Sequence, residues 1–287
     1  MARRGPRLSR IVFNCIKSED ARRDWALGDA AGANFVDRET DPPENCDLRE
    51  DWWTVSDQGN SGACVGFATA DGVLRWLYVK RGMMDKRDKP SARFIWMANK
   101  ETDDLTSHPT TFLDAAGTST KLALKVARKY GCVPDHMLKM QGKLSDMPPT
   151  AFFAVASQYR IDSFFNLYQG IAARERPREL RNWISTNGPV LTRLEVDDGF
   201  FRYQPEDGVL QTYDNSVSHG GHAVCFVGYT PDHFIVRNSW GEKWGDKGFG
   251  YVSDEYVLGA FDEAYGAILN KLDPIAPPNT DALPKPK

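Results

Sequence analysis

The chain has 287 residues, of which 41% are hydrophobic and 26% are charged, and its formal net charge is -3. These values are ordinary for a soluble globular protein, and without a basic surplus they argue against nucleic acid as a main partner. No apolar run approaches the roughly 20 residues that a membrane-spanning helix needs, so no membrane association is expected. The length allows one large domain or two lobes.

The cysteines are few, odd in number and widely spaced, and no two of them form a CxxC pair. They are Cys15, Cys46, Cys64, Cys132 and Cys225. This pattern predicts neither a disulfide framework nor a zinc ribbon. It fits a reducing compartment, and we therefore expect a cytoplasmic protein. Residues 1–10 carry four arginines, but no apolar segment follows them, so they do not form a secretory signal.

Residues 1–46 are expected to form an N-terminal extension, which the Pro42-Pro43 pair links to the compact region. Its only apolar cluster is Ile11-Val12-Phe13, and Cys15 follows two residues later. One interpretation is a loose or surface-packed arm, as is common for termini. The other is a pro-segment-like arm that lies in or beside a cleft and slows the access of substrate. An extended chain covers about 3.3 Å per residue, so half the arm can reach across a cleft.

A Gly-rich turn over residues 57–64 ends at Cys64, which is the first residue of a long apolar segment. The spacing of its apolar residues predicts a helix over 64–81, buried on most sides and stopped by Gly82. A thiol in the first turn of such a helix lies at the positive end of the helix dipole, which favours the thiolate. Taken alone, a cysteine in an apolar helix is more often a small core residue.

The rest of the first half is predicted to be helix and loop. A second apolar segment covers residues 94–98, and a polar surface loop covers 100–112. A helix is expected over 120–129, with Thr118 or Ser119 as its N-cap and Gly131 as its stop.

The second half changes to β-like patterns. Strands are expected over 152–161, 190–196, 223–229, 233–237 and 248–252, with a short helix over 178–187 ended by Gly188-Pro189. The Pro-rich residues 273–287 are expected to be disordered. The fold class is therefore α+β, with a helical lobe at about 55–150, a β lobe at about 151–272 and a cleft between them.

The expected hairpin around Pro231 brings two polar side chains together. Strands that meet at this turn pair residues whose numbers sum to about 462, so His222 faces residue 240 and Asn238 lies within two positions. Neighbouring strand residues are about 5 Å apart at Cβ. An amide at that distance can fix the tautomer and orientation of an imidazole ring. His222 taken alone is more often a structural histidine.

The joint pattern is more specific than any of its parts. Gln58 precedes Cys64 by six residues, and His222 precedes Asn238 by sixteen. The sequence NSWG at 238–241 is followed by WG at 244–245 and GFGY at 248–251. On these motifs the chain, from about residue 47 to 268, resembles the papain family of cysteine peptidases. The resemblance implies a papain-like two-lobe fold over residues 47–272, with a central helix that starts at the nucleophile and an antiparallel β lobe.

The resemblance also implies the catalytic roles. Cys64 corresponds to the nucleophile that forms an acyl-enzyme thioester, and His222 to its general base. Asn238 corresponds to the residue that orients His222, and the Gln58 side chain forms the oxyanion hole with the Cys64 backbone N–H. A tetrahedral oxyanion needs preorganised neutral donors, and an amide NH₂ suits that need. The expected substrate is a peptide or protein, and no cofactor or metal is expected.

Substrate-binding positions follow from the same resemblance. They are Ala116 and Gly117, which stand where the family has a Gly-Gly edge, together with Ala223 and Trp240. Trp240 is also expected to shield the bond between Asn238 and His222 from water.

The sequence departs from the family pattern at several positions. Ser61 replaces the family's usual disulfide-forming Cys, Val65 replaces an aromatic residue, and Gly221 replaces an Asp. With no long helical pro-region in view, these features resemble the short, disulfide-free microbial branch. His219 and His222 form an H-x-x-H pair without a matching acidic ligand, so a zinc site is not expected.

We expect an endopeptidase, and three other functions stay open at this point. One is an aminopeptidase of similar fold, in which a chain terminus fills one end of the cleft. Another is a catalytically silent papain-fold binding module, although a module that only binds has no need of all four catalytic residues. The third is a transferase that uses the same thioester chemistry. The sequence does not indicate the substrate's identity, the cleavage preference or the oligomeric state.

Overall fold

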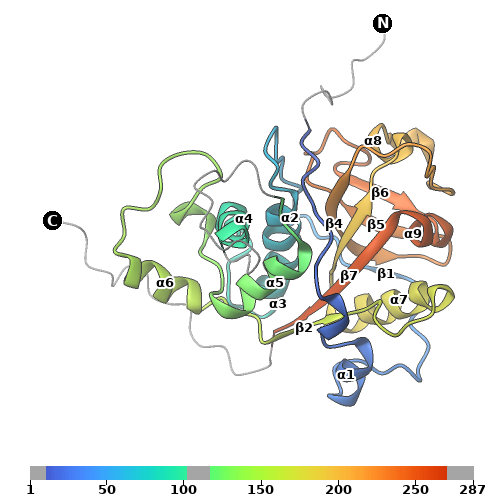
Figure 1. Cartoon of the computed structure of the whole chain (residues 1–287), viewed down its shortest axis with the longest axis horizontal. Coiled ribbons are helices and arrows are strands. Elements are labelled where there is room, and N and C mark those ends of the chain that lie inside the picture. The colour runs from blue at the N-terminus through green and yellow to red at the C-terminus, as the bar shows by residue number, and fades with distance from the viewer. Residues whose placement is uncertain (1–10, 102–116, 270–287) are drawn as a thin grey trace, which may run out of the picture.

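A computed structural model of the chain describes residues 11–101 and 117–269. Its centre is an antiparallel sheet with helices packed on both faces (Figure 1). Nearly all of the expected surface loop at 100–112 and the whole Pro-rich tail lie outside the described residues. Within the described ranges, no helix is both long and apolar enough to cross a membrane.

The sheet runs in the order β2-β7-β3-β4-β5-β6, and β1 pairs with the far end of β4. The strands are β1 (Cys46–Asp47), β2 (Ser163–Asn166), β3 (Val190–Glu195), β4 (Gly221–Tyr229), β5 (Phe234–Arg237), β6 (Phe249–Val252) and β7 (Phe261–Ile268). All nine residues of β4 are buried. Because side chains alternate along a strand, Cys225 packs into one core and its neighbour Phe226 into the other.

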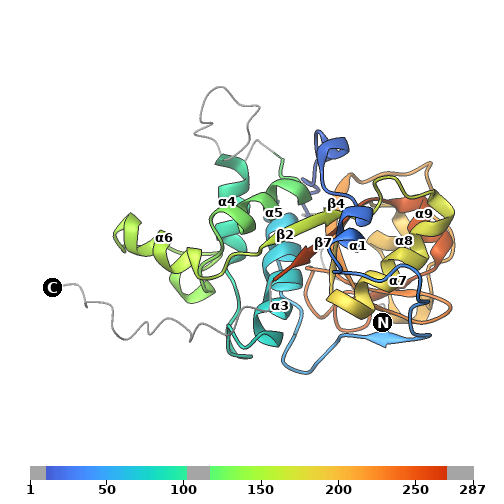
Figure 2. The ribbon, with the colours of Figure 1, turned by 90° about the horizontal axis from the view of Figure 1, so that it is seen from below.

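The helices divide between the two faces, as Figures 1 and 2 show from two directions. One side holds α2 (Cys64–Phe67), η3 (Ala68–Leu74), α3 (Arg75–Lys80), α4 (Ala92–Glu101), α5 (Thr120–Lys129) and α6 (Pro149–Ser157). The other side holds α1 (Leu27–Gly32), α7 (Arg176–Asn187), α8 (Asp198–Phe201) and α9 (Asp254–Ala260). Single turns lie at η2 (Ala21–Arg23), η4 (Asp135–Met137), η5 (Ala173–Glu175) and η6 (Pro205–Asp207).

The helix predicted from Cys64 onward is confirmed, and α2, η3 and α3 form it without a break. It stops where expected, since Gly82 has a φ of 69° and its N–H bonds to the Val79 carbonyl at 3.1 Å. The middle segment, η3, is π-helical. There Gly72 leaves room for the Cys225 sulfur, which would lie 2.4 Å from a Cβ at this position. The central helix therefore lies directly against β4.

Most of the other predicted elements are confirmed. The α5 helix covers residues 120–129 and is capped by the Ser119 hydroxyl, which accepts from the Leu122 N–H at 3.4 Å. The α7 helix starts two residues earlier than expected, at Arg176, and ends before Gly188. The hairpin of β4 and β5 has the predicted register on the side of His222, because Cys225 pairs with Arg237 and their numbers sum to 462. Next to the turn an irregularity between Phe226 and Gly228 shifts the register by one residue.

The strand expected over residues 152–161 is wrong, because this segment forms helix α6. Its aromatic residues favoured a strand, but Pro149 lies at the first helical turn and alanines fill much of the rest. Phe152 and Phe153 form a cluster with Phe94 of α4. Val155 of α6 also packs into the core of the helical side. The boundary between the helical part and the sheet therefore comes after α6 and not at residue 151.

A buried ion cluster joins the central helix to β5. Asp71 of η3 accepts from Arg75 at 3.0 Å and from Arg237 at 2.5 Å. Arg237 also donates to the backbone carbonyls of Trp53 and Thr54. Because all three charged side chains are buried, this cluster fixes the helix that begins at Cys64 against the strand that ends just before Asn238.

The N-terminal arm is part of the packed structure from residue 11 onward. Leu27 and Ala30 of α1 are fully buried in the core on the α7 side of the sheet. Strand β1 crosses the expected boundary at 46/47, because Cys46 and Asp47 both pair with β4.

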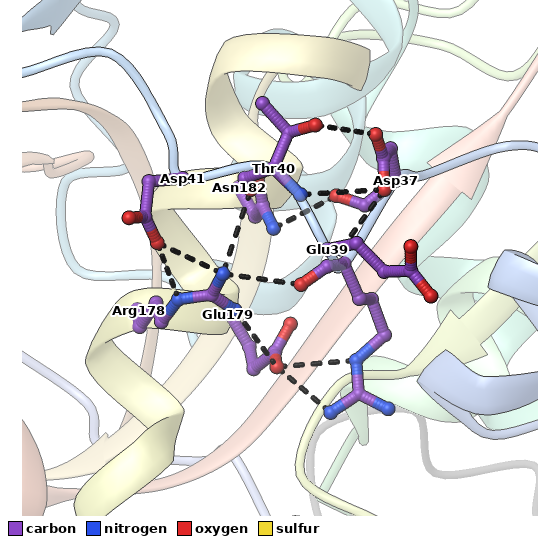
Figure 3. A network of polar contacts seen from close by, with 8 residues as sticks. Asp37, Glu39, Thr40, Asp41, Arg178, Glu179 and Asn182 are labelled. Atoms are coloured by element: carbon purple, nitrogen blue, oxygen red, sulfur yellow. Dashed lines mark hydrogen bonds and ion pairs between the residues drawn. The ribbon is translucent and has the colours of Figure 1, made fainter.

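Residues 37–41 of the arm are tied to helix α7 by a polar network (Figure 3). Asp41 accepts from Arg178 at 3.0 Å, and the Asp37 carbonyl accepts from Asn182 at 3.0 Å. Arg38 forms an ion pair with Glu179 at 2.8 Å. These contacts anchor the second half of the arm independently of its first half.

Candidate active site

Cys64 lies at the first residue of the central helix, fully buried. The turn that precedes it is closed by Ser61, whose N–H and hydroxyl both donate to the Gln58 carbonyl. The Cys15 side chain, the ring of His222 and the backbone of Ala223 are neighbours of the Cys64 sulfur, and each of them lowers its pKa. The nucleophile expected from the sequence therefore meets the start of β4, more than 150 residues away along the chain.

His222 and Asn238 are brought together as the hairpin register predicts. The Nε2 atom of His222 lies 2.8 Å from Oδ1 of Asn238, and the same oxygen accepts from the Ser239 N–H at 2.8 Å. An amide oxygen can only accept, so Nε2 of His222 donates to it. This arrangement leaves Nδ1 for the sulfur of Cys64, which is the orientation that a general base needs.

Gln58 is held in place by residues on both sides of the site. Its Nε2 donates to the Ser61 carbonyl at 3.0 Å, and its Oε1 accepts from the Ser239 hydroxyl at 2.6 Å. Its backbone N–H donates to the Ser239 carbonyl at 2.8 Å. The amide group is therefore preorganised, as an oxyanion donor must be.

The four expected substrate-binding residues differ in their placement. Trp240 stacks on His222, with ring centroids 4.6 Å apart, where it covers the bond between His222 and Asn238. Ala223 is fully buried and presents its backbone to Cys64. Gly117 lies beside the arm, since a Cβ there would meet the Ile16 side chain at 2.3 Å. Ala116 lies outside the described residues.

The arm runs directly through this site. The Cys15 N–H donates to the Gly221 carbonyl at 3.1 Å, and the Ile16 N–H donates to the Thr118 carbonyl at 3.0 Å. Thr118 in turn donates to the Asn14 carbonyl at 3.0 Å. Residues 14–16 thus bridge the helical side and the sheet side in an extended conformation, which is a common way for a peptide to dock on a protein edge.

Phe13 fills an aromatic enclosure next to the site. Its ring lies 6.1 Å from the ring of His222 and 6.0 Å from that of Trp240, both edge to face. Phe201 and His219 complete the enclosure, with centroids 5.8 and 6.1 Å from that of Phe13. The apolar cluster singled out in the sequence therefore does reach the site, through Phe13.

The two thiols that meet in the site differ in acidity. The hydrogen bond from Cys15 is the largest of the effects that together lower the pKa of Cys64 well below its ordinary value, and His222 adds to it against the effect of burial. Burial raises the pKa of Cys15 well above its ordinary value, and the neighbouring Cys64 raises it further. These directions favour the thiolate form at Cys64 and the thiol form at Cys15.

The two histidines of the H-x-x-H pair do not converge. His219 Nε2 lies 2.7 Å from Oδ1 of Asp198, whereas His222 is engaged by Asn238. Among residues 11–101 and 117–269, no group of three or more His, Cys, Asp or Glu residues could hold a metal ion.

The sequence indicated no role in the active site for Ser239, Thr118 or Arg193, and each of them contributes here. Ser239 orients Gln58, Thr118 pairs with the arm, and Arg193 donates through Nε to the Cys15 carbonyl at 3.0 Å. Only Ser239 had a usable signal, since it directly follows Asn238 in the sequence.

A comparison with known families agrees with this geometry. The sequence profile described as papain family cysteine protease matches residues 106–264, which is more than half of the chain. The chain belongs to the papain family of cysteine proteases. It is therefore a cysteine peptidase that acts on peptides or proteins. The matched region includes His222 and Asn238 but begins after Gln58 and Cys64. The assignment of Gln58 and Cys64 to the site is therefore supported by the geometry of the structure.

Individual papain-family relatives are distant. The cathepsin L-like proteinase of Fasciola hepatica is 24% identical over 217 residues, which cover 72% of this chain and 59% of that protein. Cathepsin B-like CP2 of Giardia intestinalis is 28% identical over 255 residues, which cover 78% of this chain and 73% of that protein. The match thus spans less than two thirds of the Fasciola protein.

Solved structures show the same papain-like fold. Xylellain, a cysteine protease from Xylella fastidiosa, has a TM-score of 0.71 and 19% identity, over 94% of this chain and all of that one. The digestive procathepsin L 3 of the Tenebrio molitor larval midgut has a TM-score of 0.62 and 19% identity, over 91% of this chain and 78% of that one. The predicted α+β papain-like fold is thereby confirmed.

Proposed function

We propose that Cys64, His222, Asn238 and Gln58 carry out the peptidase reaction. The Cys64 thiolate attacks the scissile carbonyl carbon, while the Gln58 amide and the Cys64 backbone N–H stabilise the oxyanion. His222 then protonates the leaving amine, and a thioester remains on Cys64. In the second half of the reaction His222 takes a proton from water, and the water hydrolyses the thioester. The observation that carries this proposal is the ring of His222, which is hydrogen-bonded to Asn238 Oδ1 through Nε2 and neighbours Cys64.

We further propose that the enzyme is a zymogen in which the arm occupies the cleft. Cys64 and His222 have no exposed surface, and residues 13–16 of the arm are among their neighbours. A substrate must therefore displace these residues before it reaches the sulfur. Relatives of similar fold include procathepsin L 3 and a ragweed cysteine protease in its proform, which supports a latent state for this chain.

Cleavage within a chain is the mode of action that we favour, and the endopeptidase assignment is part of the proposal. A reducing compartment such as the cytoplasm is also proposed, because all five cysteines lie in the described ranges and are free thiols.

The nucleophile is tested by labelling with a thiol-directed peptidyl epoxide, followed by mass spectrometry of the digested protein. We expect a single adduct on Cys64, and we expect Cys64→Ala to abolish peptide hydrolysis while the fold is retained. The matched control is Cys46→Ala, which removes the half-buried cysteine and leaves both labelling and turnover intact. Labelling of another cysteine, or substantial turnover by purified Cys64→Ala protein, would contradict the assignment.

A further inference from the structure

The arm places a second cysteine against the nucleophile. Cys15 is 3% exposed and Cys64 is fully buried. Both belong to the same buried cluster, and they are close enough for each to change the pKa of the other. The position of Cys15 is fixed on both sides of its backbone, by the Gly221 carbonyl at 3.1 Å and by Arg193 Nε at 3.0 Å. The two thiols are therefore neighbours in a site that is closed to solvent.

Further contacts hold residues 18–24 of the arm, which come after Cys15, against the body of the protein. The Ser18 hydroxyl donates to Glu263 at 2.7 Å. Lys121 of α5 pairs with Asp24 at 2.7 Å in a buried ion pair, and it also donates to the Glu19 and Asp20 carbonyls. After a transient opening of the cleft, these contacts return Cys15 to the same neighbour.

We propose that Cys15 and Cys64 form a disulfide when the protein meets a hydroperoxide, so that the arm becomes covalently attached over the nucleophile. This inference rests on the proposed role of Cys64, and it adds a modification site and a reversible off state to the latent enzyme. In the reduced protein both residues are free thiols, so the disulfide belongs to the oxidised form alone.

The chemistry balances in two steps. The Cys64 thiolate attacks one oxygen of hydrogen peroxide and breaks the O–O bond, which leaves a sulfenic acid on Cys64 and releases hydroxide. The Cys15 sulfur then attacks the Cys64 sulfur and expels its hydroxyl, and the proton of Cys15 leaves with it as water. Overall two thiols and one peroxide give one disulfide and two waters, and a small dithiol reverses the change.

The difference in acidity fits this division of roles. The lowered pKa of Cys64 makes it the thiolate that reacts with peroxide, whereas the raised pKa of Cys15 keeps it a thiol until the sulfenic acid has formed. A sulfenic acid with no thiol nearby continues to sulfinic acid, which a thiol reductant does not restore. The neighbour therefore preserves the nucleophile as well as blocking it.

The test treats the full chain with hydrogen peroxide, blocks the remaining thiols under denaturing conditions and maps the unreduced digest by mass spectrometry. We expect a peptide pair linked through Cys15 and Cys64 in the wild-type protein and in the control Cys46→Ser. In Cys15→Ser and Cys15→Ala we expect no such pair and sulfinic acid on Cys64. Dithiothreitol should restore peptidase activity severalfold further in the wild type than in either Cys15 variant.

Three outcomes would overturn the disulfide. They are sulfinic acid on wild-type Cys64 at the rate seen in Cys15→Ala, a link from Cys64 to a cysteine other than Cys15, and an unmodified pair under conditions that oxidise Cys46. The peptide map does not depend on turnover, so it is separate from the test of the catalytic role. Normal turnover by Cys64→Ala would reject the proposed function whether or not the link forms.

Discussion

The amide of Gln58 is held by hydrogen bonds to Ser61 on its own turn and to Ser239 on the sheet side. Ser239 follows Asn238, whose side-chain oxygen also accepts from the Ser239 N–H. One residue thus contacts both the oxyanion donor and the residue that orients the general base. Small displacements of either group weaken catalysis strongly, because the donors act on charge that develops only in the transition state.

Replacing Gln58 by Ala should lower kcat by about 10²–10³-fold and change KM little, since its bond forms mainly in the transition state. Ser239→Ala should lower kcat by a smaller factor, because the amide stays in place but loses one constraint. The control is Ser157→Ala, a partly exposed serine on α6, far from the site. Steady-state kinetics measure kcat and KM for each variant. A Gln58→Ala protein that is altered only in KM would show that Gln58 is not an oxyanion donor.

The arm behaves as two elements with different roles. Residues 13–16 lie in the site, whereas α1 and the network around Arg178 fasten the later part to the α7 side of the sheet. Deleting everything before Asp47 would remove Leu27 and Ala30 from a core and cut β1 in half. A substitution within residues 13–16 therefore tests inhibition more cleanly than removal of the arm does.

Phe13→Ala should raise the kcat/KM of the full chain toward a small peptide substrate by about tenfold. Loss of a partly buried aromatic ring weakens docking of the arm by about 1.5 kcal/mol, and a tenfold change in an equilibrium corresponds to about 1.4 kcal/mol. Phe153→Ala, an exposed ring on α6, is the matched control. Equal kcat/KM for Phe13→Ala and wild type, both folded, would show that these residues do not inhibit.

At the scale of the whole molecule, the ion cluster at Asp71 joins the part that carries Cys64 to the part that carries Asn238. Burial alone would raise the pKa of Asp71, but the charges of Arg237 and Arg75 outweigh it, and the pKa is lowered. A carboxyl group with a lowered pKa stabilises the folded state at pH values above its unfolded pKa. That contribution is lost as the pH falls toward the folded pKa.

Asp71→Asn should therefore destabilise the protein at neutral pH by about 3–5 kcal/mol, because two buried arginines lose their counter-charge. Below about pH 4, the ordinary pKa of Asp, the free energy of unfolding should fall less steeply in the variant than in the wild type. Urea unfolding followed over this pH range measures both effects. Asp85→Asn, at an exposed carboxyl paired with Arg87, is the control, and an equal effect of the two variants would contradict the role of the cluster.

The sequence by itself determined the elements whose signals are local. The central helix was predictable because its apolar spacing and Gly82 need no partner to be recognised. The meeting of His222 with Asn238 was predicted from a hairpin centred on Pro231, and the register found beyond the irregularity at residues 226–228 agrees with it. The papain-like pattern supplied Gln58 and Cys64. Helix α6 was missed because its aromatic residues favour a strand when they are judged locally. In the structure Phe152 packs against Phe94 of another helix, and the local sequence carries no sign of that contact.

Only the tertiary structure decided what the arm does. The sequence allowed a loose arm or one in the cleft, and nothing local separates the two. Cys15 meets Cys64 because Gly221 and Thr118, from opposite sides of the cleft, both pair with residues 14–16. Ser239 reaches Gln58 because strand pairing aligns residues 56–58 with 239–241. Such contacts join residues 102 to 206 positions apart, and their register depends on the packing of the whole sheet against the central helix.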